Sequence, residues 1–104
     1  MSGDEATQIR VIETPGLIDE LRRARHNLLK SYFKWIDQMN ELGIHAAQMV
    51  RHDHKLSTRF KEDRTGWWAT RLSQKYRIFY KVRREEEVDV IEIIRFETHN
   101  KQNY

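Results

Sequence analysis

The sequence predicts an α+β domain in which a helical hairpin packs on a mainly antiparallel four-stranded sheet, in the order β-α-α-β-β-β. Three observations predict this fold class. A short alternating segment comes first, a long stretch with apolar residues at spacings of three and four follows it, and three β-rich runs close the chain. At 104 residues, the chain is expected to form a single domain over residues 1–104.

The first strand is predicted from residues 8–13, QIRVIE, in which apolar and polar side chains alternate. Thr14 and Pro15 come next. Threonine is a good N-cap, and proline is well tolerated at the first helical position, where its missing N–H is not needed. The pair therefore predicts that a helix begins directly after the first strand.

The helical region runs over 17–42, where apolar side chains keep to one face, and Gly43 is a predicted C-cap. An unbroken helix of this length would measure ~39 Å, whereas a domain of this size has a radius of gyration of roughly 13 Å. We therefore predict a break at residues 25–27, with Asn27 capping the second helix of a hairpin.

The segment 43–65 is largely polar and charged and is predicted to be a long loop, with a short helix over IHAAQMV as the alternative. After Gly66 the character changes to WWATRL, RIFYKV and VDVIEIIRF. Short connections separate these three β-rich runs, so they predict an antiparallel meander.

Composition narrows the class of protein. The chain has no cysteine, which excludes disulfides, thiolate nucleophiles and sulfur-ligated zinc, and no stretch of ~18 apolar residues that would span a membrane. A soluble, cytoplasmic protein is expected. The net charge is +3, but residues 51–84 carry eleven basic and three acidic residues, a local charge of +8. Interleaved aromatic residues make this block typical of a phosphate-backbone binder, with a solubilising surface as the alternative.

Several kinds of chemistry find no support. His45, His52 and His54 lie close together, but no well-spaced further ligand completes a metal set. There is no glycine-rich phosphate loop and no G-x-S-x-G sequence. We therefore expect no metal and no cofactor.

The residue types that remain suit RNA cleavage by attack of a ribose 2′-OH on the adjacent phosphate. That reaction needs a base, an acid and cations around the phosphorane-like transition state. Arginine is the preferred clamp because its planar fork grips two phosphate oxygens. Arg71, Arg77 and Arg95 are the candidates, one on each of the last three predicted strands.

Side-chain direction decides whether these arginines converge. A three-residue turn over residues 73–75 would place Arg71 and Arg77 opposite one another on the same sheet face, whereas a four-residue turn would separate them. Arg95 alternates in step with Ile91 and Ile93. The alternative is that the arginines are solvated or pair with nearby carboxylates, namely Glu85, Glu86, Glu87 and Glu92.

The stretches TGWWATRLSQKYRIFYKV and VIEIIRFETHNKQNY resemble the second half of the RelE/ParE superfamily of bacterial type II toxins. The pattern consists of a small-Gly-aromatic-Trp strand (65–68), a basic-plus-Leu pair (71–72), an aromatic-Arg pair opening a strand (76–82), and a tail with His99 and Tyr104. The hairpin is most similar to the YoeB-like branch. The resemblance covers residues 55–104 and implies a RelE-like fold and ribosome-dependent mRNA endonuclease activity.

The resemblance also implies roles for residues. Arg77 is implied as the clamp on the scissile phosphate, His99 as a general acid or base, and Tyr104 as a stacking or proton-handling group. Arg95 joins them as a clamp or as a structural ion pair. The implied RNA-binding residues are Lys61, Arg71, Lys75 and Lys101.

The chain departs from the family pattern in several places. The paired lysines that some RelE branches carry on the second strand are absent over residues 69–71, and residues 44–53 have no clear family counterpart. The YoeB-like branch has a glutamate base upstream of a Leu-Lys pair, and here Thr58 stands at that position, with Glu62 as a possible substitute. Many members have an arginine after the terminal histidine, whereas here Asn100 follows and Lys101 comes next. The general base is therefore left unassigned.

The resemblance implies partners as well. An acidic antitoxin protein would bind the helices and the basic groove, and mRNA in the ribosomal A site would be the substrate, with no membrane association. Two alternatives stay open: a ParE-like toxin that binds DNA gyrase without nuclease chemistry, and a simple basic RNA-binding module.

Overall fold

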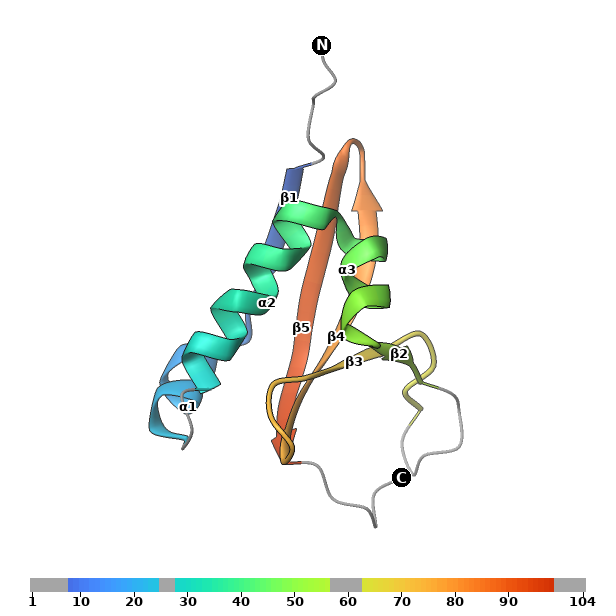
Figure 1. Ribbon diagram of the computed structural model, residues 1–104. Coiled ribbons are helices and arrows are strands. Elements are labelled where there is room, and N and C mark those ends of the chain that lie inside the picture. The colour runs from blue at the N-terminus through green and yellow to red at the C-terminus, as the bar shows by residue number, and fades with distance from the viewer. Residues whose placement is uncertain (1–7, 25–27, 57–62, 99–104) are drawn as a thin grey trace.

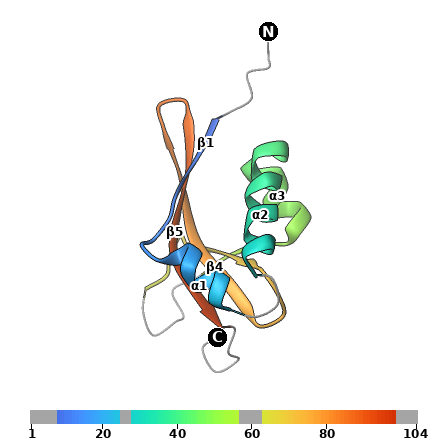
Figure 2. The same ribbon diagram turned by 90° about the vertical axis from the view of Figure 1, so that its left-hand side faces the viewer.

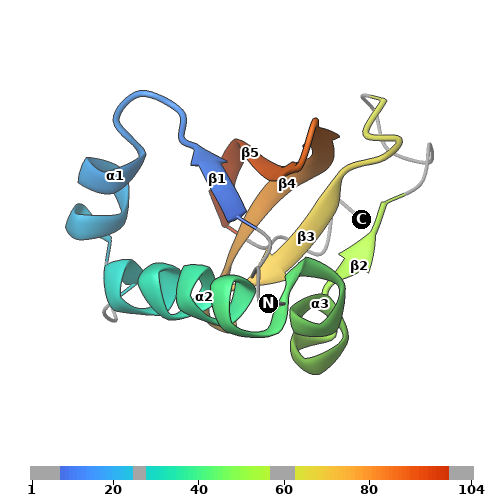
Figure 3. The same cartoon turned by 90° about the horizontal axis from the view of Figure 1, so that it is seen from above.

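The structure, a computed structural model, describes residues 8–24, 28–56 and 63–98. In this part of the chain, three helices lie on one face of a five-stranded sheet (Figures 1, 2 and 3). The elements are β1 (Gln8–Ile12), α1 (Leu17–Arg23), α2 (Leu28–Leu42), α3 (Ile44–Arg51), β2 (His54–Lys55), β3 (Trp68–Arg71), β4 (Tyr76–Glu85) and β5 (Val88–Thr98). The α+β class predicted from the sequence is confirmed.

The sheet has the strand order β1-β5-β4-β3-β2. Strands β3, β4 and β5 form the predicted antiparallel meander, and β1 joins β5 in parallel. The fifth strand was not predicted, because β2 is two residues long and pairs with β3 across a segment of the chain. A strand this short has no alternation of its own, and only its partner defines it.

The start of α1 differs from the prediction at Thr14 and Pro15. The N-cap is Gly16, in the left-handed region at φ 81°, where glycine avoids the Cβ penalty. The Thr14 carbonyl oxygen accepts a hydrogen bond from the Leu17 N–H at 3.1 Å, so residues 14–17 form a turn that precedes the helix. The threonine and the proline therefore belong to this turn, and helix α1 begins at Leu17.

The predicted break in the helical region is confirmed. Helix α1 ends at Arg23, Ala24 is extended, and α2 begins at Leu28. The predicted cap, Asn27, lies outside the described residues. At the other end of α2, the Gly43 N–H donates to the Met39 carbonyl at 3.0 Å with φ 86°, which confirms the predicted glycine cap.

Residues 44–51 form helix α3, so the loop predicted over this region is wrong at its start and the alternative of a short helix is correct. The helix buries Ile44, Ala47 and Gln48 against the rest of the fold. It ends at His52, which is left-handed at φ 61°. Tertiary packing therefore stabilises a helix that its own sequence favours only weakly.

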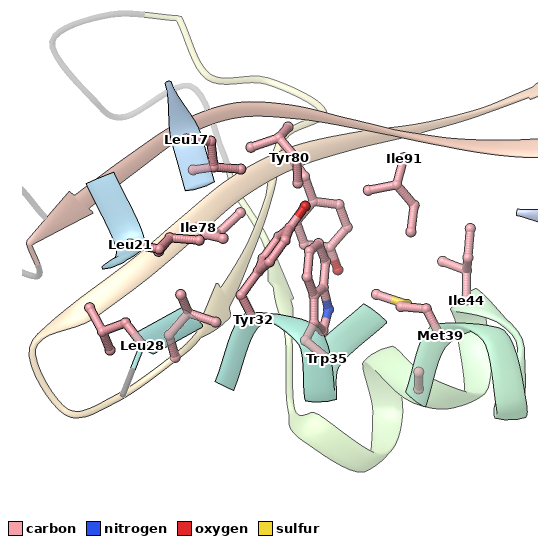
Figure 4. Packing of buried hydrophobic residues seen from close by; sticks show 13 residues of the cluster. Leu17, Leu21, Leu28, Tyr32, Trp35, Met39, Ile44, Ile78, Tyr80 and Ile91 are labelled. Atoms are coloured by element: carbon pink, nitrogen blue, oxygen red, sulfur yellow. The ribbon is translucent and has the colours of Figure 1, made fainter. Parts of the chain in front are cut away.

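The main core lies between the helices and the sheet. Trp35 of α2 is fully buried. Its ring centroid lies 5.0 Å from that of Tyr80 on β4 and 5.9 Å from that of Tyr32 (Figure 4). Replacing a buried tryptophan with alanine costs about 3–5 kcal/mol of stability. Trp35 thus joins the longest helix to the central strand. None of the described helices has the length and apolar character to cross a membrane.

The opposite face of the sheet, called the outer face below, has its own small apolar cluster. Four buried residues form it: Leu56, Trp67, Ala69 and Phe79. Residues two positions apart on a strand point to the same face of the sheet. The basic side chains two positions away from Ala69 and Phe79 therefore also lie on the outer face. The site described below lies there.

Candidate functional site

Arg71 and Arg77 are backbone partners across the β3–β4 hairpin. The Leu72 N–H donates to the Tyr76 carbonyl at 3.0 Å, which leaves residues 73–75 as the turn. This is the three-residue turn that would bring the two arginines together, and they share the outer face because directly paired residues point the same way. Glu97 of β5 pairs with Arg77 on its other side. One row of the outer face therefore contains two arginines and a glutamate.

A second row lies beside the first. His54 of β2 pairs with Ala69 of β3, which pairs with Phe79 of β4, and Phe79 pairs with Arg95 of β5. The small side chain of Ala69 stands between the histidine and the bulky phenylalanine. Space is therefore left next to His54, on the side where the arginine row lies.

The position of Arg95 corrects the alternation read from the sequence. The pairing shifts by one residue between Phe79 and Tyr80, so Phe79 is opposite Arg95 while Tyr80 is opposite Ile93. Ile94 is the extra residue of this bulge, and an extra residue breaks the simple alternation of faces. Ile93 packs in the helix-side core, whereas Arg95 lies on the outer face.

A pocket of about 190 Å³ opens where the two rows meet α3. The described residues that line it are Arg51, His52, His54, Ala69, Arg71 and Arg77. They supply three guanidinium groups and two imidazoles, and none of them is a carboxylate. A concave site with this lining is electrostatically suited to an anion with several oxygen atoms.

Arg51 is fixed in this pocket by hydrogen bonds from three of its nitrogens. Nε donates to Thr70 Oγ1 at 3.0 Å, Nη1 to Gln38 Oε1 at 2.7 Å, and Nη2 to the Arg71 carbonyl at 2.7 Å. Burial lowers the pKa of Arg51, and the nearby Asp53 carboxylate acts in the opposite sense. The side chain therefore joins α2, α3 and β3 and contributes a fixed positive charge.

A buried polar network lies on the helix side of the pocket. Tyr80 donates to Asp53 Oδ2 at 2.6 Å and accepts from Gln48 Nε2 at 3.1 Å. Burial raises the pKa of the Asp53 carboxyl, while its hydrogen bonds and Arg51, whose Nε is 3.9 Å from Oδ1, act to lower it. The network holds the segment that leads from α3 into β2, and this segment carries His54.

His54 is exposed at the pocket and is the one imidazole there that occupies a strand position. Burial of part of the ring lowers the pKa of His54, as do the charges of Arg77 and Arg71, while Asp53 raises it. The balance favours the neutral imidazole. In this form the ring has one nitrogen lone pair that can accept a proton.

Beyond Phe79, the outer face carries a cluster of cations over aromatic rings. The Arg64 guanidinium lies 4.8 Å from the Phe79 ring centroid, and both Arg64 and Arg95 lie over Trp67, at 5.2 and 5.5 Å. Glu97 Oε2 accepts from Arg64 at 3.3 Å and from Arg95 at 3.0 Å. Of the two interpretations left open for Arg95, these contacts favour the structural ion pair.

The other predicted site residues are distributed as follows. Arg71 and Arg77 share the pocket, whereas Lys75 is exposed in the hairpin turn and is not among the residues that line it. The remaining four lie outside the described residues: Lys61, His99, Lys101 and Tyr104. Their predicted roles stay predictions.

Sequence reasoning missed the contributions of Arg51 and His54. The H-x-H sequence at residues 52–54 offers two imidazoles, but the described residues contain no group of three or more His, Cys, Asp or Glu placed to hold a metal. The pairing of β2 with β3 turns His54 toward the arginines, and hydrogen bonds to α2 and β3 place Arg51. That pairing is not local, so the sequence does not display it.

Comparison of the sequence with protein-family models and with curated proteins finds no match. Comparison of the structure finds similar folds. A chain of the archaeal RelE-RelB complex from Pyrococcus horikoshii matches with a TM-score of 0.62 and 18% identity, covering 88% of this chain and 94% of that one. A chain of the YoeB-YefM complex from Staphylococcus aureus matches with a TM-score of 0.60 and 16% identity, covering 89% and 99%.

A third match is to the DinJ-YafQ toxin-antitoxin complex from E. coli, with a TM-score of 0.53 and 19% identity, covering 88% of this chain and 93% of that one. The chain therefore has the fold of the RelE, YoeB and YafQ structures, which is the fold that the resemblance implied. At identities below 20% the likeness concerns the fold, and function has to be argued from the site.

Proposed function

We propose that this protein is the toxin of a type II toxin-antitoxin system and acts as an endoribonuclease on mRNA in the ribosomal A site. One observation carries the proposal: Arg71 and Arg77 converge with His54 in a basic pocket on the outer face of a toxin-like fold. A pocket lined by guanidinium groups and imidazoles fits a phosphodiester and has the residue types that cleavage by 2′-OH attack requires.

Arg77 is proposed as the clamp on the scissile phosphate. Its side chain is buried, with 6% of the residue exposed, and it stands on the central strand of the meander between Arg71 and Glu97. A guanidinium held in this way can donate two parallel N–H groups to the non-bridging oxygens as negative charge builds up on them. Arg71, which is exposed, is proposed to bind the adjoining backbone.

The remaining roles follow the resemblance. His99 is proposed as a general acid or base and Tyr104 as a stacking or proton-handling group. Lys61, Lys75 and Lys101 are proposed to contact the RNA backbone, where each phosphate contact adds affinity that salt weakens. No metal enters the proposed reaction, because the arginines supply the positive charge that a metal ion would otherwise provide.

The proposed protein partner is an acidic antitoxin. The RelE and YoeB structures named above are complexes with RelB and YefM. By analogy, we propose that an antitoxin binds this chain over its basic surface, to which residues 51–84 contribute a local charge of +8. The antitoxin segment would fold as it binds, and its binding would keep the toxin away from the ribosome.

The test is 5′-end mapping of an mRNA incubated with the protein, with and without translating ribosomes. Codon-phased cuts that need ribosomes are expected for the wild type and are expected to disappear in Arg77→Ala. The matched control is Arg22→Ala, which removes the same charge from an exposed position on α1, at 65% side-chain exposure. Absence of cuts under both conditions would contradict the proposal and favour a gyrase poison or an RNA-binding module.

A further inference from the structure

We propose that His54 is the general base that takes the proton from the attacking ribose 2′-hydroxyl. The inference rests on the proposed function and names the group that the sequence left unassigned. It starts from the strand pairing: His54 is fixed opposite Ala69, one row from Arg71 and Arg77, on the face where these arginines stand. A phosphate held by the arginines would present its flanking ribose to this imidazole.

The geometry of the pocket supports this choice. The lining consists of Arg51, Arg71 and Arg77 with His52, His54 and Ala69. Arginine stays protonated at physiological pH and cannot act as a base. Among the described lining residues, the two histidines are therefore the only groups that can accept a proton near neutral pH.

His54 is better placed than His52. His52 is the left-handed cap residue that ends α3, where its backbone N–H donates to the Met49 carbonyl at 3.2 Å. His54 occupies a strand position, where its partner has only a methyl group as a side chain, so the space beside the imidazole belongs to the pocket. A substrate can reach His54 there because its side chain is exposed.

Charged groups face His54 from each neighbouring element. Arg51 and Asp53 flank it at the end of α3, Arg71 faces it from β3, and Arg77 from β4. Burial and the two strand arginines lower the pKa of His54, against the effect of Asp53. The imidazole is therefore neutral at physiological pH and ready to accept a proton, which is the state that a general base requires.

The step balances in atoms and electrons. The free lone pair of the His54 imidazole takes the 2′-hydroxyl proton while the O2′–P bond forms. The P–O5′ bond breaks with its electron pair going to O5′, and O5′ receives a proton from protonated His99, the proposed acid, or from water. The products are a 2′,3′-cyclic phosphate and a 5′-hydroxyl end. The imidazolium then returns its proton to solvent.

The experiment measures single-turnover cleavage of ribosome-bound mRNA by the full chain from pH 5 to pH 8. His54→Gln, which keeps a polar side chain without a usable base, is expected to lower the rate constant by ~100-fold or more. The toxin concentration that gives half of the maximal rate constant is expected to change less than about threefold, because the arginines still bind the phosphate. His45→Gln is the matched control, because it removes an exposed imidazole from α3 that is not among the residues lining the pocket, and the expected change is less than about threefold.

The pH profile is the second readout. The wild-type rate is expected to rise with pH through an apparent pKa below the ordinary histidine value of about 6.5 and then to level off, and His54→Gln is expected to lack this rise. Added imidazole is expected to restore part of the rate of His54→Ala, which shows that the variant is folded. An unchanged rate in His54→Gln, or a retained rise, would overturn the assignment of the base alone. Absence of cleavage by the wild type would instead overturn the proposed function, and the assignment with it.

Discussion

Arg71 and Arg77 stand directly opposite each other across a three-residue turn, two like charges held at one end of a hairpin. Directly opposed like charges destabilise a strand pair. Because both arginines line the basic pocket, the pair concentrates positive charge at this end of the hairpin. On its other side, the backbone partner of Arg77 is Glu97 of β5, so one carboxylate belongs to the same row of the sheet.

Replacing Arg77 with alanine or with lysine separates the effect of its positive charge from the effect of its planar guanidinium group. Arg77→Ala is expected to lower the cleavage rate by about 100- to 1,000-fold, as the loss of one donor to a transition-state oxyanion does in other enzymes. Arg77→Lys is expected to recover only part of this, because a lysine keeps the charge without the planar fork. The rates are measured in the ribosome-programmed assay, with Arg22→Ala as the control. Full activity in Arg77→Lys would contradict a bidentate clamp.

The polar network behind the pocket should be important for stability. Tyr80→Phe leaves Asp53 Oδ2 and Gln48 Nε2 without their shared partner in a buried site, so the free energy of unfolding is expected to fall by about 1–3 kcal/mol. Urea denaturation measures this change. The double variant that also carries Asp53→Ala is expected to lose less stability than the sum of the losses in the two single variants, by at least ~0.5 kcal/mol. Strict additivity would show that the network is not coupled.

The lowered pKa of His54 predicts how stability depends on pH. Its native value lies below the value of about 6.5 in the unfolded chain, so between the two the unfolded chain binds more protons, and stability is lost as the pH falls. The raised pKa of Asp53 acts in the opposite sense above its ordinary range. The informative quantity is therefore the difference between wild type and His54→Gln.

Thermal unfolding at pH 7 and pH 5.5 measures this difference. The wild type is expected to lose more of its melting temperature than His54→Gln as the pH is lowered. His52→Gln serves as the control that removes a neighbouring imidazole from the same segment. An equal loss in the wild type and in His54→Gln would mean that the environment of His54 does not disfavour its charge.

The C-terminal residues provide a test that is independent of the pocket. Deleting residues 99–104 removes His99, Lys101 and Tyr104 together. We expect this truncation to abolish cleavage while the melting temperature changes by only a few degrees, because the buried apolar clusters of the described residues are built from positions before 99. Cleavage assays and thermal unfolding on the same preparation measure both. A collapse of stability would assign the tail a structural role.

Local patterns predicted much of the fold. The helical hairpin followed from the spacing of apolar residues over 17–42, and the meander followed from three β-rich runs with short connections. The opposition of Arg71 and Arg77 depends on the length of one turn, and the structure selects the three-residue turn from the two lengths that the sequence left open. Each of these features is determined by residues that are neighbours in the sequence, which is why the sequence displays them.

The features that were missed depend on partners far along the chain. The two residues of β2 become a strand only by pairing with Ala69 and Trp68, and this pairing places His54 in the pocket. Gln38 and Thr70 hold Arg51 from separate elements. The pattern of apolar and polar residues over 44–55 does not predict these contacts, so the sequence alone does not indicate a site built from α3 and β2.

The bulge at Ile94 determines how β5 responds to the deletion or insertion of one residue. Ile93 packs toward the helices and Arg95 away from them, so removing Ile94 would leave a regular strand whose remaining residues keep their present sides. Inserting a residue at the same place would instead bring the wrong side chains toward the core. We therefore expect this strand to tolerate the loss of one residue at position 94 better than the gain of one, and an alignment with distant relatives should allow a gap there.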